Sequence, residues 1–334
     1  MTRQIGILGA GTWGTALGRL LTKNQHHVTV WSALSDQIDL LERDREHPNL
    51  PGIRLPDELC FTRSMAEAVK DRDLIVIATP SVYVRETVRA AKSFLSAGQT
   101  LVTVAKGIES DTLMTMSEVI EDVLGGTPAL PIAALSGPTH AEEVIRDMPS
   151  AIVSASTDPA TAALVQEVFS NGQFRVYTNT DIHGVELCGA LKNIIALAAG
   201  MAHGLGYGDN ARAALITRGM AEIRRLGIAM GCHEDTFRGL AGIGDLIVTC
   251  SSLQSRNFKC GDMVGRGIPP DEAIRRVGMV VEGVNALHAA MQLKQRHHVV
   301  MNISESVSRV FAGEADSRTV AEALMSRALK AETD

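Results

Sequence analysis

The chain has 334 residues, of which 45% are hydrophobic and 21% are charged, and its formal net charge is −6 at pH 7. This length exceeds the size at which one hydrophobic core usually keeps growing, so two domains are expected. A mildly acidic chain has no basic excess for the phosphates of DNA, RNA or an anionic membrane, which argues against these partners.

The N-terminus passes directly from Met1-Thr2-Arg3-Gln4 into an apolar run at residues 5–8. It lacks the charged leader, apolar segment and cleavage site of a secretory signal peptide. No stretch of about 18 apolar residues free of charge occurs, which is the length that a membrane helix needs. We therefore expect a cytoplasmic protein without a membrane span.

The first half of the chain alternates short, nearly continuous apolar runs with stretches of helical periodicity. Such runs are typical of strands buried on both faces of a largely parallel sheet, with helices as right-handed crossovers. The predicted strands are residues 4–8, 27–31, 73–78, 100–105, 132–135, 151–154 and 174–177.

The first predicted strand leads into a glycine-rich loop with the spacing G-x-G-x-x-G, formed by Gly9, Gly11 and Gly14. In dinucleotide-binding folds the first glycine permits a tight turn, the second lets a pyrophosphate approach the backbone, and the third lets helix and strand pack closely. The helix N-terminus that follows favours an anion. A second strand follows at the expected distance, so the sequence predicts a dinucleotide site.

The choice between NAD and NADP stays open at the end of the second predicted strand. In NAD sites a carboxylate at this point binds the adenosine ribose, but here residues 30–33 read VWSA and the first acid is Asp36. Arg43 and Arg45 are placed either to reach a 2′-phosphate or to form a solvated helix face.

From about residue 182 onward the sequence has only helical periodicity, broken by the glycine-rich turns GLGYGDN, LAGIGD and GRGIPPDE. We therefore predict a Rossmann-type α/β dinucleotide-binding domain with a mostly parallel sheet at residues 1–180. An all-α substrate and catalytic domain is predicted at residues 181–334. Because no flexible linker separates the two, the first helix of the second domain is expected to pack against the sheet domain, near a cleft between them.

Three segments of the second half carry polar residues in apolar surroundings. The segment GVELCGALKNIIALAAG at residues 184–200 is apolar on every side of a helix and yet contains Lys192 and Asn193. The second segment, AGIGDLIVTC, leads from glycines into Asp245, with Thr249 one turn later on the same face. The third, SLQSRNFKCG, contains Ser255, Arg256 and Asn257 in succession. Taken singly, these residues could be a structural ion pair, a helix cap and a surface charge.

Beside a dinucleotide site, the same residues supply what the oxidation of an alcohol requires. Hydride transfer to nicotinamide must be matched by loss of the hydroxyl proton to a base whose pKa is near neutrality. Burial lowers the pKa of a lysine such as Lys192, while a nearby Asp245 would orient it and partly oppose that shift. An arginine with amide donors beside it, as at Arg256, suits a phosphate monoester.

Five widely spaced cysteines include no C-x-x-C pair, and the two His-His pairs point their rings apart. We expect free thiols and no metal site.

Ordered motifs cover nearly the whole chain: GAGTWGTAL near the start, LPGIRLP at 50–56, AKGIE at 105–109, SGPTHAEE at 136–143, the Lys192 segment, NARAALITRGMAEI at 210–223, AGIGDLIVTC, QSRN, and VVEG at 280–283. In these motifs the chain closely resembles the bacterial-type NAD(P)-dependent glycerol-3-phosphate dehydrogenases. The resemblance implies reversible reduction of dihydroxyacetone phosphate to sn-glycerol 3-phosphate with NADH or NADPH, for glycerophospholipid synthesis. It also implies a homodimer. Many bacterial members have Arg or His where this chain has Ala33, so a strong NADP preference is not implied.

The resemblance also implies roles for individual residues. Lys192 matches the catalytic lysine, a general base in oxidation and a general acid in reduction, with Asp245, Thr249 and Asn193 in its polar cluster. Substrate contacts are implied for Lys106, Gly137, Thr139, Lys192, Asp245, Ser255, Arg256 and Asn257. Besides Gly9, Gly11 and Gly14, dinucleotide contacts are implied for Thr12, Trp13, Lys106, Ala141, Arg256, Val280 and Glu282. For Lys106 the binding of ligands at the carboxyl ends of parallel strands independently favours such a position.

Two other interpretations compete with this one. A 3-hydroxyacid or 6-phosphogluconate dehydrogenase would share the two domains and a lysine base, but Arg256-Asn257 and AGIGDLIVTC resemble the glycerol phosphate enzymes specifically. A dinucleotide sensor without catalysis would not need Lys192, Asp245 and Arg256 together.

Overall fold

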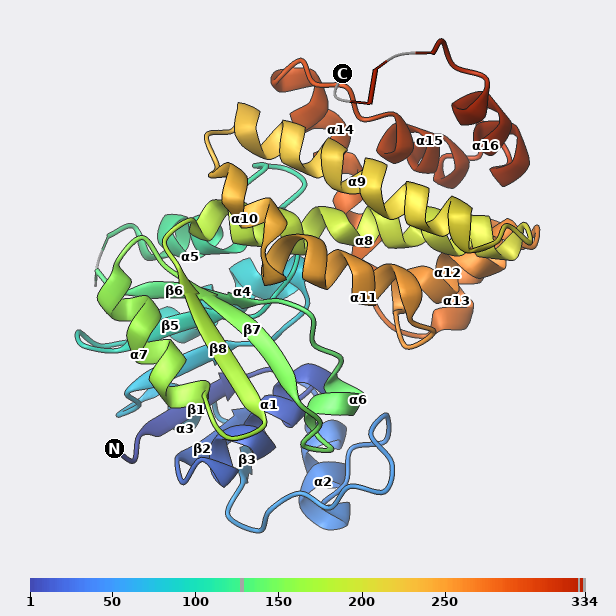
Figure 1. Cartoon of the computed structure of the whole chain (residues 1–334). Coiled ribbons are helices and arrows are strands. Elements are labelled where there is room, and N and C mark those ends of the chain that lie inside the picture. Colours follow the sequence, from blue (N-terminus) through green and yellow to red (C-terminus); the bar gives the residue numbers. More distant parts are fainter. Residues whose placement is uncertain (127–128, 330, 333–334) are drawn as a thin grey trace.

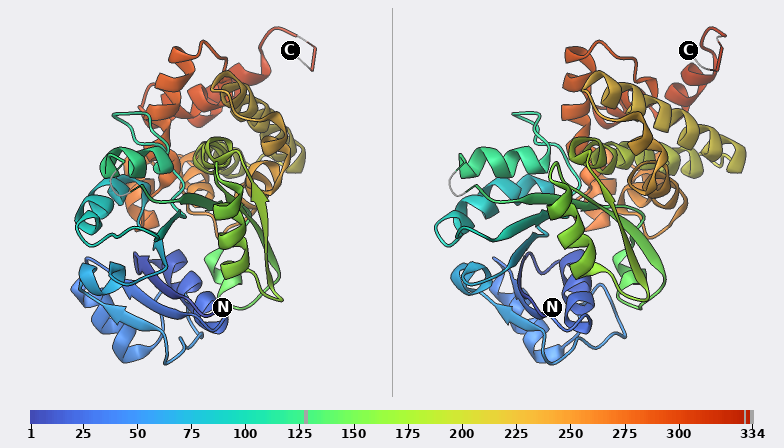
Figure 2. Two further views of the ribbon diagram at one scale, coloured as in Figure 1. Left: turned by 90° about the vertical axis from the view of Figure 1, so that its left-hand side faces the viewer. Right: turned by 60° about the vertical axis from the view of Figure 1, so that its left-hand side comes forward.

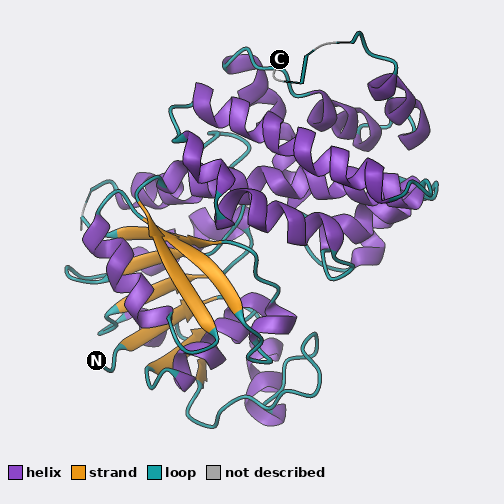
Figure 3. Cartoon of the chain, viewed as in Figure 1, coloured by secondary structure: helices purple, strands orange, loops and turns teal. Residues whose placement is uncertain are grey.

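The computed structural model describes residues 1–126, 129–329 and 331–332. An eight-stranded sheet occupies one end of the molecule and a group of helices the other, so that β1 and α16 lie far apart (Figure 1). We call residues 4–179 the sheet region and residues 182–325 the helical region. Figure 2 shows from two further sides that the two regions meet along one surface, and Figure 3 shows that the strands are confined to the sheet region.

The sheet has the strand order β3-β2-β1-β4-β5-β6-β7-β8. β6 and β7 pair antiparallel, and every other pair of neighbours is parallel, which confirms the predicted mostly parallel sheet. The strands are β1 (Gln4–Leu8), β2 (His27–Trp31), β3 (Cys60–Thr62), β4 (Leu74–Ile77), β5 (Thr100–Thr103), β6 (Ile132–Ser136), β7 (Ser150–Ala155) and β8 (Phe174–Asn179). The seven predicted strands are all present. β3 was not predicted, because a strand of three residues is too short to show an apolar run.

Helices cover both faces of the sheet and bury a core on each. The core on one face includes residues of α1 (Thr12–Lys23), α2 (Ser35–Asp44), α6 (Ala141–Val144) and α7 (Pro159–Phe169). The core on the other face includes residues of α3 (Met65–Val69), α4 (Val84–Lys92) and α5 (Met116–Leu124). A short 3-10 helix, η1 (Ser81–Tyr83), follows β4 at its carboxyl end.

The helical region is built around α8 (Ile182–Gly204), and its core continues along this helix. The helices that follow are α9 (Asp209–Ala229), α10 (Glu234–Arg238), α11 (Asp245–Ser251), α12 (Arg256–Gly265), α13 (Pro270–Val277), α14 (Glu282–Arg296), α15 (Asn302–Phe311) and α16 (Ser317–Met325). Of the helices described, α8 is long and apolar enough to cross a membrane by length and composition, but its apolar window is completely buried inside the protein. Such burial is that of a core helix.

The segment LAGIGD, predicted as a turn, contains a π-helical turn instead. Residues Leu240–Gly244 form this turn, η2, which runs directly into α11. Wide π-helical turns often occur at functional sites, and here the turn brings Asp245 to the first position of α11.

Candidate functional site

The glycine-rich loop has the geometry that a dinucleotide requires. Gly9 has φ of +126°, and a Cβ there would lie 2.7 Å from the backbone carbon of Ala78. A Cβ on Gly14 would lie 2.0 Å from the carbonyl oxygen of Gly9, so packing excludes a side chain at both positions. At Gly11, the N-cap residue just before α1, a Cβ would meet no described atom within 4 Å. That open space beside the helix N-terminus fits a pyrophosphate.

Two predicted dinucleotide contacts, Thr12 and Trp13, begin α1, and Trp13 packs against the core of the sheet region. At the end of β2 the Oγ of Ser32 donates a hydrogen bond to Gln37. Both arginines considered for a 2′-phosphate contact residues of the protein: Arg43 pairs with Asp44, and Arg45 donates to the carbonyl oxygens of Pro56 and Leu59.

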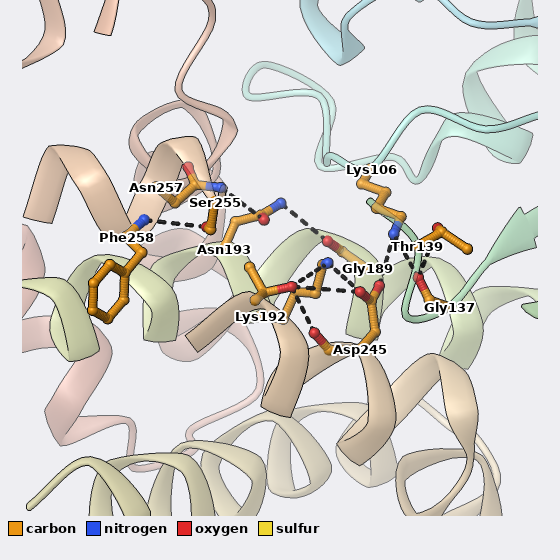
Figure 4. Close-up of polar contacts among 11 residues, drawn as sticks. Lys106, Gly137, Thr139, Gly189, Lys192, Asn193, Asp245, Ser255, Asn257 and Phe258 are labelled. Atoms are coloured by element: carbon orange, nitrogen blue, oxygen red, sulfur yellow. Dashed lines mark hydrogen bonds and ion pairs between the residues drawn. The ribbon is translucent and has the colours of Figure 1, made fainter. Parts of the chain in front are cut away.

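The structure brings Lys192 and Asp245 together (Figure 4). Thr249 also contacts Lys192. The Nζ of Lys192 lies 2.5 Å from Oδ1 of Asp245 and 2.7 Å from Oγ1 of Thr249. Thr249 in turn donates to the backbone oxygen of Asp245 at 2.6 Å, which fixes the start of α11. Lys192 is 5% exposed and Asp245 1%, so α8 and α11 enclose a nearly dry ion pair.

A second lysine shares the same carboxylate. Lys106, which follows β5, donates from Nζ to Oδ2 of Asp245 at 2.8 Å and to the carbonyl oxygen of Gly137 at 3.1 Å. The Oγ1 of Thr139 donates to that same carbonyl oxygen at 3.1 Å. Asp245 therefore holds one ammonium from each region, and the loop after β6 lies beside them (Figure 4).

The electrostatics of this cluster favour a lysine that titrates near neutral pH. Burial lowers the pKa of Lys192 from 10.5 to about 7; the charge of Asp245 opposes this shift, and the ammonium of Lys106 adds to it. Burial alone would raise the pKa of Asp245, but the two lysines outweigh it and hold that pKa below its ordinary value. The carboxylate therefore stays ionised while Lys192 can exchange its proton.

Asn193 and Asn257 form a buried chain of amides beside Lys192. The Nδ2 of Asn193 donates to the carbonyl oxygen of Gly189, and its Oδ1 accepts from Nδ2 of Asn257 at 2.9 Å. The Oδ1 of Asn257 accepts from the amide of Gly283 at 2.9 Å. Asn257 thus ties α12 to α8 and α14.

The start of α12 is suited to an anion. Ser255 caps this helix by accepting from the amide of Phe258, and Arg256 is the exposed first residue of the helix. An arginine at a helix N-terminus combines a guanidinium fork with the positive end of the helix dipole. The remaining predicted contacts lie at helix starts or just before one: Ala141 begins α6, Val280 precedes α14, and Glu282 begins α14.

Two further residues, His140 and Ser81, lie near the predicted site residues, and neither was predicted from the sequence. Burial lowers the pKa of His140, and the charges of Lys192 and Lys106 lower it further; its Nε2 has no hydrogen-bond partner among the described residues. The feature of the sequence that could have indicated His140 is its position inside the motif SGPTHAEE. Ser81 donates hydrogen bonds to Glu282, and no motif in the sequence marks it.

In the part of the chain that the structure describes, no group of three His, Cys, Asp or Glu residues is arranged to hold a metal ion.

Comparison with known proteins identifies the family of both halves of the chain. Residues 4–162 match the family described as NAD-dependent glycerol-3-phosphate dehydrogenase N-terminus. Residues 181–322 match the family described as NAD-dependent glycerol-3-phosphate dehydrogenase C-terminus.

Similar proteins match over almost the whole length. The chain is 55% identical to NAD(P)+ glycerol-3-phosphate dehydrogenase 2 of Lactobacillus delbrueckii subsp. bulgaricus, over 98% of each chain. It is 48% identical to NAD(P)+ glycerol-3-phosphate dehydrogenase of Agathobacter rectalis, over 98% of this chain and 97% of the relative. The crystal structure of glycerol-3-phosphate dehydrogenase from Coxiella burnetii superimposes with a TM-score of 0.93 at 35% identity, covering 98% of this chain and 99% of that one. The chain therefore belongs to the NAD-dependent glycerol-3-phosphate dehydrogenase family.

Proposed function

We propose that the protein catalyses the reversible reduction of dihydroxyacetone phosphate to sn-glycerol 3-phosphate with NADH or NADPH. The observation that carries the proposal is the buried contact of Lys192 with Asp245, which lies 2.5 Å away, in a family of glycerol-3-phosphate dehydrogenases. A pKa of about 7 lets Lys192 both accept and donate a proton under ordinary conditions.

The chain's own residues divide the work between proton transfer and binding. In oxidation, neutral Lys192 accepts the hydroxyl proton at Nζ; in reduction its ammonium returns a proton to the carbonyl oxygen. The dinucleotide, when bound, accepts or supplies the hydride. Asp245 keeps Lys192 in place and holds Lys106 near the same point, where a second ammonium can bind the substrate. Arg256 and the start of α12 bind the phosphate.

The proposal also assigns a role to each domain and gives the protein's location and oligomeric state. Residues 1–180 bind the dinucleotide, and residues 181–334 supply most of the substrate site. The protein acts on small molecules in the cytoplasm as a homodimer, without a membrane span, and its product serves glycerophospholipid synthesis. The complete burial of the apolar window of α8 and the acidic net charge support a partner set without membranes or nucleic acids.

The absorbance of NADH or NADPH, followed with dihydroxyacetone phosphate, tests the proposal. We expect the parent to oxidise at least one of the two, and Lys192→Ala to lose activity by about 10²–10⁴-fold, the usual contribution of a general acid or base. Lys70→Ala, which removes an exposed lysine of the sheet region, is the matched control and should keep the parent's rate. A parent inactive with both dinucleotides contradicts the activity, and an active Lys192→Ala contradicts the mechanism.

The substrate half of the proposal is tested in the same assay. Arg256→Ala should raise the KM for dihydroxyacetone phosphate far more than it weakens dinucleotide binding, because the guanidinium is assigned to the phosphate. Unchanged saturation by dihydroxyacetone phosphate would remove Arg256 from the substrate site.

A further inference from the structure

A carboxylate of the helical region is bound by a serine of the sheet region. Glu282, the first residue of α14, accepts hydrogen bonds from the backbone amide of Ser81 at 3.0 Å and from its Oγ at 2.5 Å. Ser81 is 8% exposed and begins η1, just beyond the carboxyl end of β4. Both donors of one residue are thus directed at a single charged acceptor, an arrangement stronger than two neutral hydrogen bonds.

On the sheet side, the segment that ends in Ser81 touches the glycine-rich loop. Ala78 in this segment lies so close to the loop that a Cβ on Gly9 would be 2.7 Å from its backbone carbon. A Cβ on Gly14 would be 3.2 Å from the Cβ of Ala78. A displacement of Ser81 would therefore disturb the loop assigned to the pyrophosphate.

Ser81 also packs against the residue that follows Lys106. A Cβ on Gly107 would lie 2.3 Å from the Cβ of Ser81, so only a hydrogen fits between these two residues. Oε2 of Glu282 would lie 3.7 Å from that Cβ, at an ordinary contact distance. Because Gly107 is joined directly to Lys106, the position of Ser81 influences the lysine that bonds Asp245.

On the helical side, hydrogen bonds connect the residue after Glu282 with Asn193, the neighbour of Lys192. The amide of Gly283, next to Glu282, donates to Asn257, and Asn257 donates to Asn193. A Cβ on Gly283 would lie 2.6 Å from the carbonyl oxygen of Asn193, so α14 and α8 touch at the backbone. Packed contacts and hydrogen bonds therefore run without a gap from Ser81 to the helix turn that carries Lys192.

We propose that Ser81 is a positioning residue whose two bonds to Glu282 hold the glycine-rich loop and the Lys192 cluster in one fixed relation. Dinucleotide binding and turnover then both depend on the Ser81 hydroxyl. This inference rests on the proposed function, because it takes Lys192 as the base. It goes beyond the dinucleotide contact that the family resemblance implies for Glu282, because that contact alone would leave the Ser81 side chain dispensable.

The chain contains a matched control for this contact. Glu186 of α8 accepts from the amide of Ser117 at 2.8 Å and from its Oγ at 2.5 Å, which also joins the helical region to the sheet region. Ser117 is 3% exposed and lies in α5, and a Cβ on Gly9 or Gly14 would meet Ala78, Thr79 or Gly9 but no residue of α5 at its nearest contacts. Ser117→Ala therefore removes an equivalent bond without the proposed positioning effect.

The test compares Ser81→Ala, Glu282→Gln, the double variant and Ser117→Ala. Dinucleotide affinity is measured without substrate, by titrating NADH or NADPH and following the quenching of the fluorescence of the two tryptophans, both in the sheet region. The kcat, the KM for dihydroxyacetone phosphate and the Tm are measured on the same preparations. Should Ser81→Ala fail to fold, Ser81→Cys, which replaces the hydroxyl with a weaker donor, takes its place.

We expect Ser81→Ala to raise the dinucleotide Kd and to lower kcat, each by about ten-fold, the effect of one charge-assisted hydrogen bond. The double variant should be no worse than the poorer single variant, because Ser81→Ala removes, and Glu282→Gln weakens, the same contact. Ser117→Ala should lower the Tm at least as much and leave Kd and kcat unchanged.

Two results would overturn the proposal: a Ser81→Ala enzyme with the parent's Kd and kcat, or equal effects of Ser81→Ala and Ser117→Ala on Kd and kcat. A defect in Glu282→Gln beside a parent-like Ser81→Ala belongs to the first result and would indicate that Glu282 acts on the dinucleotide without Ser81. Failure of the proposed function would give a different result, namely an inactive parent or an active Lys192→Ala. The dinucleotide Kd of each variant could still be compared in that case.

Discussion

At the scale of single residues, the site depends on a balance between burial and charge at Lys192. Burial is the largest influence and lowers its pKa, while Asp245 pulls the pKa back up. The sequence indicated this lysine, because an ammonium in an otherwise apolar helix requires a partner. It did not indicate that Asp245 also binds Lys106, because these two residues are 139 positions apart and only the fold brings them together.

The pKa of Lys192 predicts opposite pH dependence in the two directions of the reaction. Its folded-state pKa of about 7 lies below the ordinary 10.5, so the neutral form becomes dominant above about pH 7. Oxidation of glycerol 3-phosphate needs that neutral form, so its kcat/KM should rise with pH through about 7. Reduction needs the ammonium, so its kcat/KM should fall over the same range. Initial rates in both directions, from pH 5.5 to 9, measure the two curves.

Asp245→Asn provides the control for this assignment. Because the charge of Asp245 raises the pKa of Lys192, its removal should move both curves to lower pH, besides reducing the rate. Curves with the same slope in both directions, or a variant whose curves do not move, would assign the titration to another group.

At the scale of elements, helices and strands were predicted correctly where an apolar pattern repeats within one segment. Elements that depend on contacts with other segments were not predicted. The buried strands and α8 have continuous apolar runs, so their positions were predicted. β3 is defined only by its pairing with β2. No local pattern in the sequence marks the π-helical turn at Leu240–Gly244. The amide chain of Asn193 and Asn257 likewise joins separate helices and leaves no mark in the local sequence.

The contact between α8 and α12 predicts a strong effect of one added methyl group. A Cβ on Gly200 would lie 2.2 Å from the carbonyl oxygen of Phe258, so these helices touch backbone to backbone. Gly200→Ala should therefore push α12 away and destabilise the fold by about 1–3 kcal/mol, the usual cost of overpacking. It should also impair catalysis, because α12 carries Arg256 and Asn257.

The midpoint of urea unfolding and the kcat of Gly200→Ala measure this effect. Gly172→Ala is the control, since a Cβ there would meet no atom within 4 Å among the described residues. Equal midpoints for both variants would contradict the close packing of α8 on α12.

At the scale of the whole molecule, α8 contributes to hydrophobic cores of both regions. Its first turn, with Ile182 and Val185, belongs to a core of the sheet region, whereas its contribution to the core of the helical region begins at Leu187. The pair of Lys106 with Asp245 and the bonds of Ser81 and Ser117 cross the same boundary. The sequence predicted two domains and the packing of α8 against the sheet domain, but it did not indicate the bonds that cross between the regions, because they join distant segments.

We therefore expect the two regions to unfold together, although a chain of this length commonly unfolds domain by domain. Both tryptophans, Trp13 and Trp31, lie in the sheet region, whereas most helical residues lie in the helical region, so fluorescence and far-ultraviolet circular dichroism observe different parts. Their thermal transitions should coincide at every scan rate. Removing the Ser117 bond should shift both curves equally, because the loss weakens the shared unit. Separation of the two curves in the parent would mean that α8 comes apart between its two cores and that each region is stable without the other.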